Sequence, residues 1–125
     1  MKISKPTKFT ALLLGLSLCL QLDALSQTKV AAQDVKNHID DSITVCEKVF
    51  EARFLERSQQ TILNMGGNFP NHLFTVVIKG KDRGNFRYKP EEQFKDKKIC
   101  ITGRVGLYAG LPQITITGPS QIKVE

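Results

Sequence analysis

Apolar residues alternate with polar ones in several separate segments of this chain. The two longest such segments are 42–54 (SITVCEKVFEARF) and 98–108 (KICITGRVGLY), in which β-branched residues recur at every second position. This alternation predicts strands with one face in a hydrophobic core. The same pattern predicts shorter strands at 61–65, 73–80 and 112–118, the last of which is extended by 120–124.

The two long strands also resemble each other in sequence. When they are aligned, matched pairs are Ile43 with Ile99, Val45 with Ile101, Lys48 with Arg104 and Val49 with Val105. Each strand contains one cysteine as well. The repeat favours a small closed β-barrel in which these two strands are structural counterparts.

Turn and helix residues separate the strands. Glycine and asparagine tolerate positive φ and proline stops strand pairing, so 66–71 (GGNFPN) is a predicted turn. Pro90 followed by two glutamates predicts a short helix that ends before Asp96, and 30–39 predicts a helical entry to the first strand. The residues expected to fill the core from these segments and the strands include Phe50, Phe74, Phe86 and Phe94.

The N-terminus has the layout of a secretory signal peptide. Three lysines precede the apolar stretch 9–20, and Ala24 and Ser26 suit the −3 and −1 positions of a cleavage site. We therefore expect 1–26 to be removed, 27–40 to form an extension with a short helix, and 41–125 to form one domain. The alternative is an uncleaved membrane anchor, but the apolar stretch is shorter than the roughly 18–20 residues that span a bilayer.

Charge and cysteine content change with export. The whole chain carries +6, and the predicted signal peptide removes three lysines and one aspartate, which leaves +4. A modest positive charge favours acidic partners such as nucleic acid, lipid headgroups or anionic polysaccharide.

Cys46 and Cys100 remain after removal of the signal peptide, and in an oxidising compartment they can form a disulfide if their Cα atoms lie within about 7 Å. Two reduced, half-buried thiols are the alternative.

Residues suited to catalysis are sparse. We expect His38 and His72 to be surface or turn histidines, because neither has partners at a metal-ligand spacing. Adjacent acidic pairs at 40–41 and 91–92 are typical of a turn and a helix start rather than of an acid–base pair. The cysteines do not form a CxxC motif. The sequence therefore predicts a protein that is not an enzyme and needs no metal or cofactor.

Three runs carry a resemblance to a known family. The segments 37–49 (NHIDDSITVCEKV), 61–86 and 97–114 are similar to small exported bacterial OB-fold proteins, and 107–114 (LYAGLPQI) resembles a hairpin of tRNA-anticodon-type OB domains. The resemblance covers about 34–124. It implies an all-β fold with one short helix, a five-stranded Greek-key barrel of order β-β-β-α-β-β. It also implies that the first and fourth strands pair antiparallel and close the barrel.

The resemblance implies a ligand face on the second and third strands and the loops beside them. On this chain the candidate nucleic-acid-binding residues are Arg53, Phe54, Arg57, Asn64, Thr75, Lys79, Arg104 and Tyr108. The cations would contact phosphates, Phe54 and Tyr108 would stack on bases, and Asn64 would read a base edge. Phe54 is equally suited to the core, and Tyr108 to a cap on the barrel.

The predicted function is an exported OB-fold module that binds single-stranded DNA or RNA weakly, mainly through phosphates. The alternative is an envelope module that binds a protein, a small ligand or a glycan. A third possibility is an accessory subunit or relic of a secreted nuclease, with the nuclease as its partner. We expect a periplasmic or secreted location and no stable membrane anchor.

Overall fold

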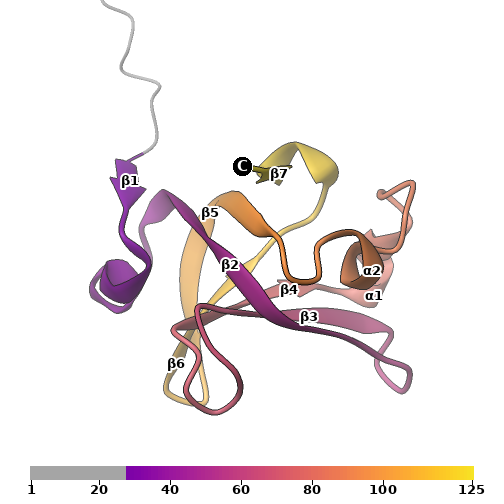
Figure 1. The fold of residues 1–125 in the computed structure, drawn as a ribbon, viewed down its shortest axis with the longest axis horizontal. Helices are drawn as coiled ribbons and strands as arrows, with labels where there is room; N and C mark the ends of the chain where they lie inside the picture. Colours follow the sequence, from indigo (N-terminus) through magenta and orange to yellow (C-terminus); the bar gives the residue numbers. More distant parts are fainter. Residues whose placement is uncertain (1–27) are drawn as a thin grey trace, which may run out of the picture.

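Seven strands form one mixed sheet in the computed structural model, which describes residues 28–125 (Figure 1). The predicted signal peptide lies outside the described residues. The strands are β1 (Thr28–Val30), β2 (Ser42–Leu55), β3 (Gln60–Met65), β4 (Phe74–Ile78), β5 (Lys98–Tyr108), β6 (Leu111–Thr115) and β7 (Ile122–Val124). The helical turns are η2 (Ala32–Asn37), α1 (Gly80–Arg83), α2 (Pro90–Gln93) and η3 (Pro119–Gln121).

Strands β2 to β6 close into an OB-like barrel. The strand order is β1-β2-β3-β4-β6-β5-β7, and an additional pairing of β2 with β5 brings the sheet back on itself. β4 and β6 are parallel, whereas β2 and β5 are antiparallel. Cys46 lies directly opposite Cys100 in that pairing, with a disulfide between them. The predicted antiparallel pairing of the two long strands and the predicted disulfide are both confirmed.

The alternating residues fill the barrel interior as their pattern predicts. Ile43, Val45 and Val49 of β2 are fully buried, as are Ile99 and Ile101 of β5. Phe74, Phe86 and Phe94 are buried as well, in agreement with the sequence. Phe50 differs, because its ring is only partly buried and lies under the ammonium of Lys48 at 5.0 Å.

The predicted strand count and helix count are wrong. The barrel has two extra edge strands, since β1 pairs with β2 and β7 pairs with β5. β1 is three residues long, too short to show alternation in the sequence. β7 lies within 120–124, which was predicted to extend the last strand, but it is a separate strand after η3 and pairs with β5. Each of the two pairs with backbone groups that an edge would leave open. Of the predicted entry helix 30–39, only 32–37 are helical, as the 3₁₀ helix η2, and Val30 belongs to β1. The connection between β4 and β5 contains two single-turn helices instead of one.

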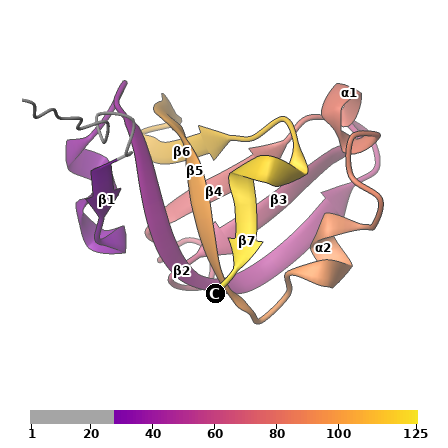
Figure 2. The same ribbon diagram turned by 90° about the horizontal axis from the view of Figure 1, so that it is seen from above.

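The two ends of the barrel carry different segments. β1 and η2 lie at one end, whereas α1 and α2 lie at the other (Figures 1 and 2). At the second end the guanidinium of Arg83 donates hydrogen bonds to Thr61 and to Glu91, the latter at 2.7 Å, and lies 4.1 Å from the centre of the Phe54 ring. Among the helices of residues 28–125, none has the length and apolar character needed to cross a membrane.

A bulge in β2 determines which of its side chains face inward. The register with β3 passes from Val49 opposite Met65 to Glu51 opposite Asn64, so Phe50 is an extra residue. A bulge of this kind bends the strand and interrupts its alternation. Val49, before the bulge, is fully buried, whereas Arg53, after it, is exposed at the surface.

Candidate nucleic-acid interface

A groove of about 520 Å³ crosses the outer face of β3 and β4. The loop between β3 and β4 and the hairpin between β5 and β6 border it. Its lining residues are Arg53, Leu55, Gln60, Ile62, Asn64, Phe69, His72, Thr75, Val77, Lys79, Tyr108, Ala109, Leu111, Pro112 and Gln113. This is the face on which an OB barrel binds oligonucleotides or oligosaccharides.

The strands supply the groove floor through their alternation. Ile62 and Asn64 of β3 line the groove, whereas the intervening Leu63 is fully buried in the core. Thr75 and Val77 of β4 line it in the same way. One face of each strand therefore stabilises the barrel while the other face forms the groove.

Two exposed aromatic rings stand on the loops that border the groove. Phe69 is 65% exposed and Tyr108 is 69% exposed, although both line the groove. Exposed aromatic rings beside a groove can serve as stacking platforms for bases. Tyr108 precedes a tight turn in which Ala109 and Gly110 both have positive φ.

The carboxylate of Glu51 fixes the backbone at Phe69. Its Oε1 accepts a hydrogen bond from the Phe69 N–H at 2.7 Å and another from the Asn64 amide at 2.9 Å. These donors, the Phe69 N–H first, lower the pKa of Glu51 below its ordinary value. Thr75 in turn donates a hydrogen bond to Asn64 Oδ1 at 3.4 Å. The loop between β3 and β4 is thus bonded to the sheet beside the groove.

Two cations complete the groove. Arg53 on β2 and Lys79 just after β4 both line it and are exposed. Exposed cations bordering a stacking surface match the phosphates of a single strand. The groove therefore combines positive charge, aromatic rings, amide groups and an apolar floor.

Five of the predicted site residues come together in this groove, namely Arg53, Asn64, Thr75, Lys79 and Tyr108. The other three do not line it. Phe54 lies between the groove residues Arg53 and Leu55 on β2, but its ring is half-buried beneath Arg83, and Arg57 is exposed in the turn between β2 and β3. Arg104 lines a second hollow of about 310 Å³, where it lies 3.4 Å from Asp40. That hollow shares Tyr108 with the groove.

Sequence reasoning missed Phe69 and His72. Phe69 stands inside a turn of glycine, asparagine and proline residues. Because an aromatic residue in a turn is not part of the core-facing pattern of a strand, its position there indicates a surface role. His72 lies in the loop between β3 and β4, as the expectation of a surface or turn histidine allows, but it is buried, with 7% exposed. The sequence shows no apolar periodicity around His72 that would have indicated this burial.

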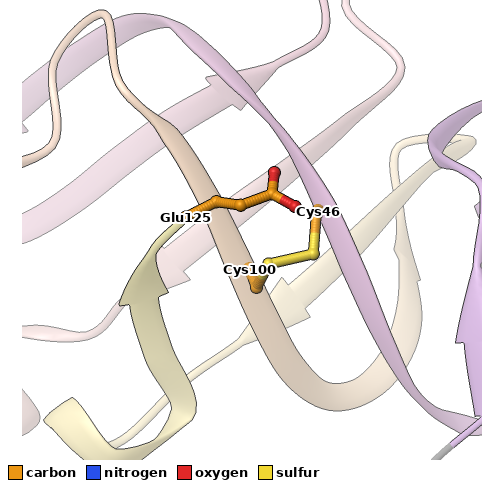
Figure 3. A group of neighbouring side chains, drawn as sticks. All are labelled: Cys46, Cys100 and Glu125. Atoms are coloured by element: carbon orange, nitrogen blue, oxygen red, sulfur yellow. A yellow bond between two sulfur atoms is a disulfide. The ribbon is translucent and has the colours of Figure 1, made fainter.

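Three potential metal ligands lie together elsewhere in the described part of the chain. The sulfurs of Cys46 and Cys100 and a carboxylate oxygen of Glu125 lie within 4.8 Å of one another (Figure 3). The two sulfurs are bonded to each other. Because a cysteine binds metal as a free thiolate, this oxidised cluster serves as a covalent link between β2 and β5.

Comparisons with known proteins give fold similarity only. No protein-family model and no curated protein sequence matches this chain. The chain is similar in structure to a protein assigned as aspartyl-tRNA synthetase from Leishmania major Friedlin, with 7% identity and a TM-score of 0.51 over 87% of this chain. It is also similar to aspartyl-tRNA synthetase from Entamoeba histolytica, with 12% identity and a TM-score of 0.52 over 89% of this chain.

The matched region is a minor part of both synthetases. It covers 23% of the Leishmania chain and 24% of the Entamoeba chain. At these identities the similarity shows that the barrel fold is shared. It agrees with the OB-type resemblance that the sequence indicated.

Proposed function

We propose that this protein is an exported binding module that takes single-stranded nucleic acid into the groove across β3 and β4, and that it is not an enzyme. The observation that carries the proposal is the placement of two exposed aromatics, Phe69 and Tyr108, beside the cations Arg53 and Lys79 in one groove. Stacking on aromatics and charge contact with phosphates are the two contributions by which such grooves hold single strands.

The comparisons support the same proposal. The two similar structures are named for aspartyl-tRNA, so barrels of this shape occur within proteins that act on a nucleic acid. Export is supported by the predicted signal peptide and agrees with the Cys46–Cys100 disulfide, since disulfides persist in oxidising compartments. N-terminal sequencing of protein recovered from the periplasm or medium tests export, with Gln27 expected as the first residue.

The binding test is fluorescence anisotropy of a labelled single-stranded oligonucleotide at several salt concentrations. We expect affinity to fall steeply with salt, and the double variant Arg53→Ala/Lys79→Ala to reduce the logarithmic salt slope by about 0.7 for each phosphate that the protein no longer neutralises. Lys123→Ala is the matched control, because Lys123 is exposed on β7 outside the groove. Absence of binding at tens of micromolar protein would refute the proposal.

The apolar floor of the groove favours a second candidate function, in which the groove binds an envelope protein, a small ligand or a glycan. Leu55, Ile62, Val77 and Leu111 contribute this floor, which phosphates alone would not use. A pull-down from envelope extract distinguishes the candidates. A partner that survives nuclease treatment and is lost with Leu111→Asp supports the second candidate, whereas a partner lost on nuclease treatment supports the first.

A further inference from the structure

His72 is a buried polar residue on the wall of the groove with unused hydrogen-bonding capacity. Its side chain is 7% exposed, it lines the groove, and its Nδ1 has no hydrogen-bond partner within residues 28–125. Buried polar atoms in folded proteins are paired in the great majority of cases, and an unpaired one is destabilising. Less than 1 Å² of Nδ1 is accessible, so a ligand seated in the groove supplies the missing partner when the ring of His72 turns toward the groove.

The protonation state of His72 suits recognition by hydrogen bonds rather than by charge. Burial lowers its pKa, and the charge of Glu51 offsets this only in part. Burial therefore favours the neutral form of the imidazole. A neutral imidazole has one donor nitrogen and one acceptor nitrogen, and the edges of nucleobases present donors and acceptors side by side.

The ring of Phe69 extends beyond His72. The two rings are stacked with an interplanar angle of 27° and centroids 5.8 Å apart. Atoms in direct contact lie about 3.5–4.0 Å apart, so a centroid separation of 5.8 Å means that the rings overlap only in part. A planar group that continues the plane of His72 can therefore lie edge to edge with the imidazole and stack on the uncovered part of Phe69.

We propose that His72 and Phe69 together form a subsite for one nucleobase, in which Phe69 stacks on the base and His72 hydrogen-bonds its edge. The subsite rests on the proposed function and deepens it, because it adds contact with bases to binding through phosphates. Glu51 acts as a positioning residue that holds Phe69 through its backbone N–H. The ligand class is a single strand that carries bases, not a bare polyphosphate.

The test compares a base-containing oligonucleotide with an abasic oligonucleotide of the same length and charge. The variant is His72→Phe, which keeps an aromatic ring against Phe69 and removes both ring nitrogens. We expect it to weaken binding of the base-containing strand about 2- to 10-fold, as loss of one net hydrogen bond does, with abasic binding unchanged. His38→Ala is the control, because His38 is the other histidine and lies outside the groove, bonded to Asp41.

Each outcome bears on one claim. If the wild type prefers the base-containing strand and His72→Phe reduces the preference about 2- to 10-fold, the subsite is supported. If His72→Phe keeps the full preference, the role of His72 is refuted. If wild type and His72→Phe bind both strands alike, the subsite is refuted and phosphate-directed binding stands. If the wild type binds neither strand, the proposed function and the subsite both fail.

A second measurement does not depend on the folding of a variant. In wild-type protein with ¹⁵N-labelled histidine, a base-containing strand is expected to shift the ring nitrogens of His72 and leave those of His38 unchanged. The abasic strand is expected to shift neither. Equal shifts of His72 with both strands would overturn the assignment of His72 to the base.

Discussion

Replacing both cysteines by alanine tests how much the closure of β2 on β5 contributes to stability. The disulfide joins residues 54 positions apart. In the chain-entropy model, constraining a loop of that length in the unfolded state stabilises the native state by about 4 kcal/mol at 25 °C. Domains of this size are stable by roughly 5–15 kcal/mol in total, so Cys46→Ala/Cys100→Ala should lose a large share of its stability and still fold.

Urea unfolding followed by circular dichroism measures this loss. For a denaturant slope of about 2 kcal/mol/M, the midpoint should fall by about 2 M. Wild-type protein unfolded in the presence of a thiol reductant should show the same midpoint as the double variant.

The matched control is the double variant Thr44→Ala/Thr102→Ala. These threonines are the neighbouring cross-strand pair of β2 and β5, and their hydroxyls are hydrogen-bonded at 2.8 Å without closing a covalent loop. We expect the control to lose only about 1 kcal/mol. A loss in the cysteine variant no greater than in the control would refute the loop-closure reasoning.

Three further predictions concern the groove and its border. Phe69→Ala should weaken single-strand binding about 5- to 150-fold, the range for loss of one stacked base, and unchanged anisotropy titrations would contradict a stacking role. The lowered pKa of Glu51 means that its contribution to stability is complete above its ordinary value of 4.5 and is lost as pH falls through the lower folded-state pKa. Between about pH 5 and pH 3 the melting temperature should therefore fall more for wild type than for Glu51→Gln, and parallel profiles would exclude this contribution. Gly66→Ala should destabilise the protein by about 1–3 kcal/mol in urea unfolding, because Gly66 has φ +80° and an added Cβ would lie 2.7 Å from Leu73 Cδ1. Gly84→Ala is its control, with no atom within 4 Å of the added Cβ, and equal losses in the two variants would argue against strain at position 66.

The barrel could be predicted from the sequence because its core residues follow period two. Ile43, Val45 and Val49 are spaced as a half-buried strand requires, and β5 shows the same spacing. The pairing of these two strands was implied by the OB-fold resemblance. The edge strand β1 could not be predicted in this way, because the three residues Thr28–Val30 carry no period. The residues of β7 were predicted to be extended, but not to form a separate strand beside β5. Their pairing depends on the backbone of neighbours that lie far away in sequence.

The candidate site was only partly predictable for a related reason. Asn64, Thr75 and Lys79 were found because outward positions on a strand follow from the inward ones. Arg53 and Phe54 were both assigned to the ligand face because they lie near the first loop, although adjacent residues of a strand face opposite sides. After the bulge at Phe50, Arg53 faces the groove and Phe54 packs beneath Arg83. His72 and Phe69 lie in a loop, where side-chain position follows from tertiary hydrogen bonds such as that to Glu51.

The extra residue in β2 adds a local bend to the strand. Deleting position 50 would leave Val49 opposite Met65 and Glu51 opposite Asn64 in a regular ladder, so the side chains that follow would keep their present faces. The deletion would remove the bend that a bulge gives its strand. Glu51 and Arg53 would still face outward, but from a straighter strand. The outline of the groove therefore depends on position 50, whereas the set of β2 side chains that face it does not.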